Sequence, residues 1–342
     1  MKQRGQRSGP HQAGSGSSIE VLAWDEFTGQ LEDYDRQVEE SEDIDRWCSS
    51  SGWVVPAHQA FGPHRDPWIR RTPDGYLVFA QDRHGRVWKS LEPLEACWGL
   101  ACPVVGSNAR ELARQLVIAT RAEPDWMVLV LTGLIPRSAR FEQLVRALEP
   151  HAALQLHGET RRQIASLEGG LDGFLSRRTA KLRENLRRES RMVRAAGITF
   201  EAGDPSTHSA GELYDRIQEV EVRSWKGMRQ VGIQSGGMYD FYERMVQRLH
   251  TAGGLRLLFA RHEGRDVAYI LGGISRACYR GLQFSYDAAY RRFGLGNVIQ
   301  LEMVARIADE GVLEYDLGVD LEYKQRWSDR SFDTVTLVAM RM

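Results

Sequence analysis

Residues 291–311 read RRFGLGNVIQLEMVARIADEG, which we interpret as a glycine-containing loop followed by a helix over 297–311. Three segments before the loop alternate or cluster apolar residues as β-strands do, and we predict them to be consecutive antiparallel strands: LRLLFARHEG (255–264), RDVAYILGGI (265–274) and ACYRGLQFSYD (277–287). A further strand, EYDLG (314–318), follows the helix. This order predicts a mixed α/β (α+β) fold whose sheet is mostly antiparallel.

The loop has the features of an anion-binding turn. Gly294 and Gly296 allow the backbone to bend tightly, and the amides of Leu295 and Asn297 lie where the helix leaves its first N–H groups unpaired. Arg291 and Arg292 add positive charge. A pyrophosphate would fit such a nest at a helix N-terminus. The plainer interpretation is a strand-to-helix connection that any α/β protein needs, and the loop alone does not decide between the two.

The same order of elements resembles the GNAT acyltransferase superfamily, whose acyl-CoA signature is R/Q-x-x-G-x-G/A at this place. Arg291, Gly294 and Gly296 match that signature. The resemblance implies acyl-CoA, such as acetyl-CoA, as a co-substrate and no tightly bound cofactor.

Further segments are similar to the Fem-like branch of that superfamily, in which one chain carries two GNAT units. They are EVRSWKG (221–227), the basic helix near 174–196, and above all EYDLGVDLEYKQRW (314–327). Members of this branch often have Pro-Gly in the loop, where this chain has Leu295-Gly296. The resemblance implies tandem GNAT-like domains, each with a mixed, mostly antiparallel sheet flanked by helices: a diverged copy over 19–165 and an acyltransferase domain over 166–342.

The candidate catalytic residues follow from this resemblance and from their positions. Fem-like enzymes use a lysine near the C-terminal end to stabilise the oxyanion, and YKQRW places Lys324 in a similar setting. Asp316 and Asp320 flank Gly318 and are candidates to orient Lys324 or accept a proton, although Asp and Gly are also ordinary turn residues. Tyr286 and Asp287 end the strand beside the loop and are further acid or base candidates.

The acceptor pocket is predicted to include Trp225 and Lys226, which follow a helix; a tryptophan there is also consistent with plain core packing. Seven of the nine tryptophans lie before residue 130. They indicate either an aromatic acceptor site in the first half or a well-filled small core.

The helix over 174–197 is strongly basic, with eight Lys or Arg and two Glu between Arg177 and Arg194. That face could bind the phosphates of a tRNA, although a charged helix face is more often simply solvated. We therefore consider three functions. The first is transfer of an acyl group from acyl-CoA to a small-molecule, saccharide or peptide amine in a biosynthetic reaction. The second is a Fem-like aminoacyl-tRNA-dependent transfer onto a natural product or cell-wall precursor, and the third is a non-catalytic nucleic-acid-binding module.

The composition of the chain limits the number of domains and the classes of protein that we consider. A chain of 342 residues with 42% hydrophobic and 27% charged residues suits two globular domains. The four cysteines are scattered, so we expect no metal site. No apolar run is long enough to span a bilayer, and residues 1–18 read as a disordered Gly/Ser-rich tail rather than a signal peptide. These features predict a cytoplasmic protein.

Overall fold

The computed structural model describes residues 19–82, 89–123 and 125–342. The expected tail at 1–18 lies outside the described residues. The described strands are β1 (Glu20–Leu22), β2 (Asp66–Thr72), β3 (Gly75–Asp82), β4 (Lys89–Pro93), β5 (Val104–Val105), β6 (Trp126–Leu134), β7 (Ala152–Ser166), β8 (Thr199–Ala202), β9 (Leu255–His262), β10 (Arg265–Ser275), β11 (Cys278–Tyr286), β12 (Glu314–Val319) and β13 (Arg330–Arg341).

The helices of the first half are α1 (Trp24–Thr28), α2 (Leu31–Glu40), α3 (Arg46–Ser49), α4 (Ser51–Phe61), α5 (Ala109–Arg121) and α6 (Ala139–Leu148). Those of the second half are α7 (Gly170–Ser176), α8 (Ala180–Ala195), α9 (Ala210–Arg223), α10 (Trp225–Met228), α11 (Gly236–Thr251), the 3₁₀ helix η1 (Ala288–Phe293), α12 (Leu295–Asp309) and α13 (Glu322–Gln325).

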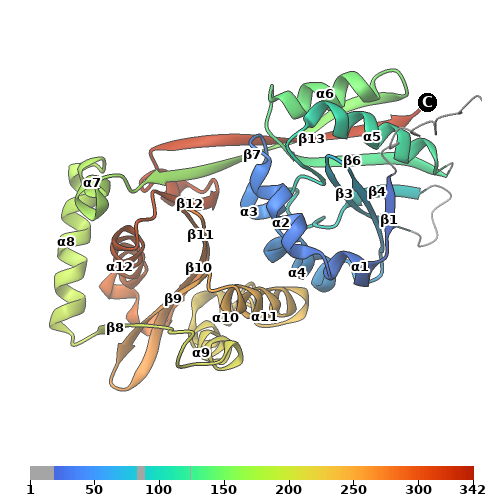
Figure 1. Ribbon diagram of the computed structural model, residues 1–342. Helices are drawn as coiled ribbons and strands as arrows, with labels where there is room; N and C mark the ends of the chain where they lie inside the picture. Colours follow the sequence, from blue (N-terminus) through green and yellow to red (C-terminus); the bar gives the residue numbers. More distant parts are fainter. Residues whose placement is uncertain (1–18, 83–88, 124) are drawn as a thin grey trace, which may run out of the picture.

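One sheet runs through the described residues in the order β1-β2-β3-β4-β6-β13-β7-β12-β11-β10-β9-β8, with β5 paired to β3. The β4–β6 and β11–β12 pairs are parallel, and the other described pairs are antiparallel. Helices cover both faces at each end of the sheet (Figure 1). The predicted mixed α/β fold with a mostly antiparallel sheet is therefore confirmed.

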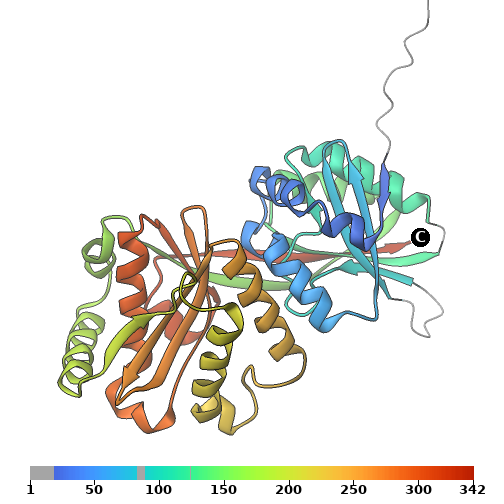
Figure 2. The same ribbon diagram turned by 60° about the horizontal axis from the view of Figure 1, so that its bottom comes forward.

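The two halves of the molecule are joined by the long strands β7 and β13, which run from one half to the other (Figure 2). β13 pairs with β6 of the first half along one edge and with β7 along the other. The expected domain boundary at 165/166 falls at the end of β7, so both halves contribute to a continuous sheet. The division into domains 19–165 and 166–342 stays a prediction.

In the second half, the β8–β12 strands lie between two helical layers (Figure 1). One layer is α7, α8 and α12, which pack on residues such as Leu258, Ile270 and Trp327. The other is α9, α10 and α11, whose core residues are continuous with those of the first half. This second layer forms the contact between the halves, because α11 packs on α4 through Trp53 and Phe241.

The predicted single helix over 174–197 is wrong in one respect. α7 ends at Ser176, and α8 starts anew at Ala180 because the Thr179 side chain caps it, accepting a hydrogen bond from the Leu182 amide. Between the two, the buried Arg178 side chain binds Asp329 and the Ser328 carbonyl oxygen, which fixes the segment after α13.

Candidate active site

A cavity of about 590 Å³ opens where strands β11 and β12 separate. The two strands pair only from Cys278 with Glu314 to Arg280 with Asp316. Beyond that point the β12–β7 register shifts at Gly318, whose φ of 85° favours glycine, and β12 leaves β11. The free edge of β11 becomes one wall of the cavity.

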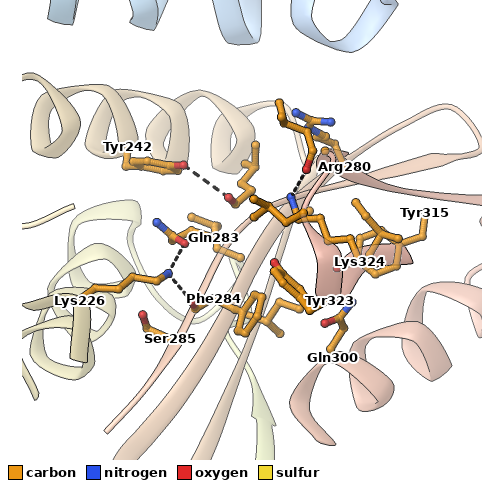
Figure 3. Close-up of a pocket in the computed structure, with 18 of the residues that line it drawn as sticks. Lys226, Tyr242, Arg280, Gln283, Phe284, Ser285, Gln300, Tyr315, Tyr323 and Lys324 are labelled. Carbon is orange, nitrogen blue, oxygen red and sulfur yellow. Dashed lines mark hydrogen bonds between the residues drawn. The ribbon is translucent and has the colours of Figure 1, made fainter. Parts of the chain in front are cut away.

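Lys324 reaches the cavity from α13 (Figure 3). The helix is anchored by Trp327, which is fully buried and packs against Phe174 with ring centroids 5.9 Å apart. The Lys324 ammonium donates to the Val319 carbonyl oxygen at 2.9 Å. Burial and, after it, the nearby charge of Arg280 lower the pKa of Lys324 to about 8, while the charge of Asp316 acts in the opposite direction.

Lys226 reaches the cavity from the opposite side of the view in Figure 3. Ser224 ends α9 and caps α10 by accepting from the Gly227 amide, which presents Lys226 toward β11. The Lys226 ammonium donates to Gln283 Oε1 at 2.6 Å and to the Phe284 carbonyl oxygen at 2.8 Å. Burial lowers the pKa of Lys226, although the charge of Glu221 opposes the shift.

Asp316 lies in a buried ionic network beneath the cavity. Its carboxylate binds Arg162, accepts from Arg280 at 2.6 Å and accepts from the Gly318 amide at 2.7 Å. Arg162 also pairs with Asp45 of the first half. Burial would raise the pKa of Asp316, but the charges of Arg162 and Arg280 hold it below its usual value. With its oxygens occupied in this way, Asp316 holds the base of the site together.

The other two predicted carboxylates do not line this cavity. Asp320 accepts hydrogen bonds from Gln163 and Gln325 on the turn before α13. Asp287 accepts from Arg223 at 3.1 Å and caps η1 through the Ala289 amide. Tyr286 and Trp225 do line it. Of the predicted site residues, the structure therefore brings Lys324, Lys226, Tyr286 and Trp225 to one cavity, and their roles stay predictions.

The predicted anion loop forms the N-terminus of α12. Gly294 has a φ of 65°, and the amides of Asn297 and Val298 donate back to its carbonyl oxygen. The amides of Leu295 and Gly296 therefore lie at the unpaired first turn of α12. Arg291 and Arg292 are exposed on η1, and Arg292 stacks on Phe293.

A carboxylate of the chain itself lies at this helix terminus. Glu189 of α8 accepts from Asn297 Nδ2 at 2.9 Å, and a Cβ at Gly294 would collide with the Glu189 carboxyl group. The loop would therefore fit a donor's pyrophosphate only if Glu189 moved aside, because two anions would otherwise share one helix terminus.

Several residues that line the cavity were not predicted from the sequence. Tyr323 is adjacent to Lys324 in the quoted motif, and Gln300 lies on the second turn of α12. Trp53 and Trp98 come from the first half, and no local pattern indicates that they meet β11. Trp53 also belongs to the buried core, so both interpretations of the tryptophan-rich first half stay predictions.

Within residues 19–82, 89–123 and 125–342, no three His, Cys, Asp or Glu side chains lie together as a metal site would require. In the same ranges no helix has the length and apolar character needed to cross a membrane.

Comparison with known protein families finds one match, which lies in the second half. Residues 180–325 match the model of the acetyltransferase (GNAT) domain family. A search of curated proteins finds no match.

Solved structures share the fold of the whole chain at low identity. FemX is 11% identical with a TM-score of 0.63, covering 89% of this chain and 95% of that one. A conserved protein from Bacteroides thetaiotaomicron is 13% identical with a TM-score of 0.63, covering 95% and 100%. L-PGS from Bacillus licheniformis is 13% identical with a TM-score of 0.56, covering 92% and 91%. Residues 180–325 are therefore similar to the acetyltransferase (GNAT) domain family, and the chain shares the fold of FemX and L-PGS.

Proposed function

We propose that this protein forms an amide by direct attack of an acceptor amine on an acyl-CoA thioester, in the cavity between β11 and β12. One observation carries the proposal: the strands separate at Gly318, and the Lys324 ammonium lies beside the opening within a GNAT domain. A GNAT-type transfer needs no covalent nucleophile. It needs two substrates held together and a positive group near the carbonyl oxygen that becomes negative.

Lys324 is suited to that last role. An ammonium has three N–H donors, and Val319 takes only one of those of Lys324. A pKa of about 8 leaves most of the side chain charged near pH 7. As the amine attacks, the C–N bond forms and the C–S bond breaks, and the amine proton ends on the departing thiol. Tyr286, which lines the cavity, is our candidate for passing that proton.

A second donor class is favoured by a specific observation. Glu189 lies where a CoA pyrophosphate would approach α12, whereas α8 presents exposed cations on its outer face: Lys181, Arg187, Arg188, Arg191 and Arg194. Such a face suits the backbone phosphates of an aminoacyl-tRNA. With that donor the cavity would carry out the same attack on an aminoacyl ester.

The donors are distinguished by an assay of the purified protein. The first proposal is tested by incubating the protein with acetyl-CoA and a panel of amines and measuring the release of the CoA thiol. Charged tRNA, with and without ribonuclease, tests the second. If neither CoA binding at millimolar concentration nor thiol release occurs, the acyl-CoA proposal fails in favour of the tRNA donor. Salt-dependent binding of nucleic acid without turnover of either donor would support the non-catalytic module instead.

A further inference from the structure

The cavity has an uneven balance of hydrogen-bonding groups and charges. Three basic residues line it (Lys226, Arg280 and Lys324), and within the described part of the chain no Asp or Glu does. Arg280 is neutralised by Asp316. The two lysines contact only neutral acceptors. A cation held out of water among neutral groups favours an anionic partner.

Hydrogen-bond donors of the cavity that have no acceptor also favour an anionic ligand. Gln283 and Phe284 take two of the three N–H donors of Lys226. Trp53 is 5% exposed, and its indole Nε1 has no hydrogen-bond partner in the described structure. Glu221, the carboxylate whose charge acts on Lys226, is fully buried and accepts from the Tyr269 hydroxyl. Glu221 raises the Lys226 pKa from there but does not line the cavity.

Most of the remaining wall is aromatic or aliphatic, and its aromatic residues come from both halves. Trp53 and Trp98 lie against each other at 5.1 Å in the first half, while Phe284 and Tyr323 pack at 6.2 Å in the second. Trp225 is 47% exposed at the cavity, so its ring is free to contact a ligand. A cavity of about 590 Å³ is within the usual size for a small molecule.

We propose that the amine acceptor is an amino acid or short peptide with an aromatic or large apolar side chain, and that Lys226 binds its carboxylate. This rests on the proposed function for naming the ligand an acceptor. The side chain would contact Trp53, Trp98 and Trp225, and the amine would then face the Lys324 side of the cavity. Lys226 and the tryptophans are thus specificity residues, and Lys324 acts on the reaction.

The test measures binding without any donor, so a failure of the proposed reaction does not affect it. The probes are L-phenylalanine, L-phenylalaninamide and L-alanine, and the affinity of the protein for each is measured by calorimetry at a fixed salt concentration. The amide keeps the ring and the amine but lacks the carboxylate, and alanine keeps the carboxylate but lacks the ring. We expect phenylalanine to bind at least about tenfold more tightly than either, as the loss of one charged hydrogen bond predicts.

Single substitutions test which residues cause the preference for phenylalanine. Lys226→Met should reduce phenylalanine affinity to that of the amide, while Lys181→Met, at an exposed lysine on α8, should leave it unchanged. Trp225→Ala should weaken phenylalanine and its amide equally, and because Trp225 is exposed the variant should fold. Equal binding of acid and amide, an unchanged preference in Lys226→Met, or no binding of phenylalanine at millimolar concentration would overturn the proposal.

Discussion

The carboxylate of Glu189 on α8 and the side-chain amide of Asn297 on α12 are hydrogen-bonded at 2.9 Å, at the N-terminus of α12. The contact places a negative charge of the chain itself at the positive end of that helix, where a carboxylate is stabilised. Arg188 lies 3.8 Å from the other oxygen of Glu189. The loop 291–296 is thus already matched to an anion before any donor arrives.

Removing that charge should improve binding of CoA. Glu189→Gln keeps the size of the side chain and an oxygen acceptor for Asn297, but it removes the repulsion against a pyrophosphate. We expect the affinity for CoA to rise about tenfold, which corresponds to about 1.4 kcal/mol. Calorimetry at constant ionic strength measures it. Glu184→Gln, at an exposed position one turn earlier in α8, is the control and should bind CoA as the unaltered protein does. An unchanged affinity in Glu189→Gln would show that no phosphate approaches this terminus.

Lys324 should act on the transition state. Lys324→Ala should lower kcat by about 10²-fold or more, the scale for loss of an oxyanion donor, with little change in KM. Because the pKa of Lys324 is about 8, the rate of the unaltered enzyme should fall as the pH rises through that value and the ammonium loses its charge. Lys324→Arg should recover part of the rate and lose this alkaline decline, because arginine stays charged. A normal kcat in Lys324→Ala would move the search to Asp320 and Tyr286.

Holding Lys324 charged in the cavity should also destabilise the fold. Its folded pKa of about 8 lies below the value of about 10.4 expected in an unfolded chain. The destabilisation is therefore fully present below pH 8 and is relieved as the pH rises from about 8 toward 10.4. Lys324→Met should raise the melting temperature near pH 7, with a gain that shrinks at alkaline pH. A gain that is independent of pH would indicate a packing effect instead.

Asp316 and Asp320, four residues apart, should respond differently to the same substitution. Asp316→Asn leaves Arg280 without its buried counter-charge and Arg162 with Asp45 alone, so we expect a loss of about 3–5 kcal/mol in the free energy of unfolding. Asp320→Asn, on the partly exposed turn, should change it by only about 0.5 kcal/mol. Urea unfolding of both variants measures this. An inactive but fully stable Asp320→Asn would restore Asp320 as a catalytic candidate.

The outer face of α8 should distinguish the two donors. Reversing Arg187, Arg191 and Arg194 to Glu should cut activity and flatten its salt dependence if the donor is a tRNA, because fewer counterions are released. With acyl-CoA the KM for donor should stay nearly unchanged. The control reverses three exposed arginines of the first half, Arg110, Arg137 and Arg146, which changes the net charge equally. Equal losses in both triple variants would indicate a net-charge effect and no specific role for α8.

Strands and helices with an apolar pattern in their own sequence could be predicted, whereas β7 could not. β9, β10 and β11 carry apolar runs that indicate strands, and all three are present. β7 contains Gly158, a run of exposed polar residues and the buried Arg162, so its sequence lacks a strand pattern. It is a strand because β13 and β12 pair with it from far along the chain. Partners distant in sequence leave no local signal.

The residues of the candidate site also divide into those that a local motif indicates and those that only distant packing brings to the cavity. Lys324 and Tyr286 could be named because they belong to recognisable motifs in one stretch of the chain. Glu189 looked like one of two acidic residues on a basic helix, and only the packing of α8 on α12 reveals that it meets Asn297. Trp53 and Trp98 reach the cavity only through the contact of α4 with α11.

Because β13 lies between β6 and β7, the sheet of the first half cannot be completed early in synthesis. During synthesis, residues 126–134 and 152–166 emerge long before residues 330–341, so neither strand can acquire its shared neighbour until nearly all of this sequence has been translated. The first half therefore cannot close its sheet as a finished unit ahead of the second. Such distant pairings slow folding and leave strand edges open to wrong partners in the meantime. A nascent chain halted within residues 180–325 would present those edges, and it is at this stage that the protein should depend most on chaperones.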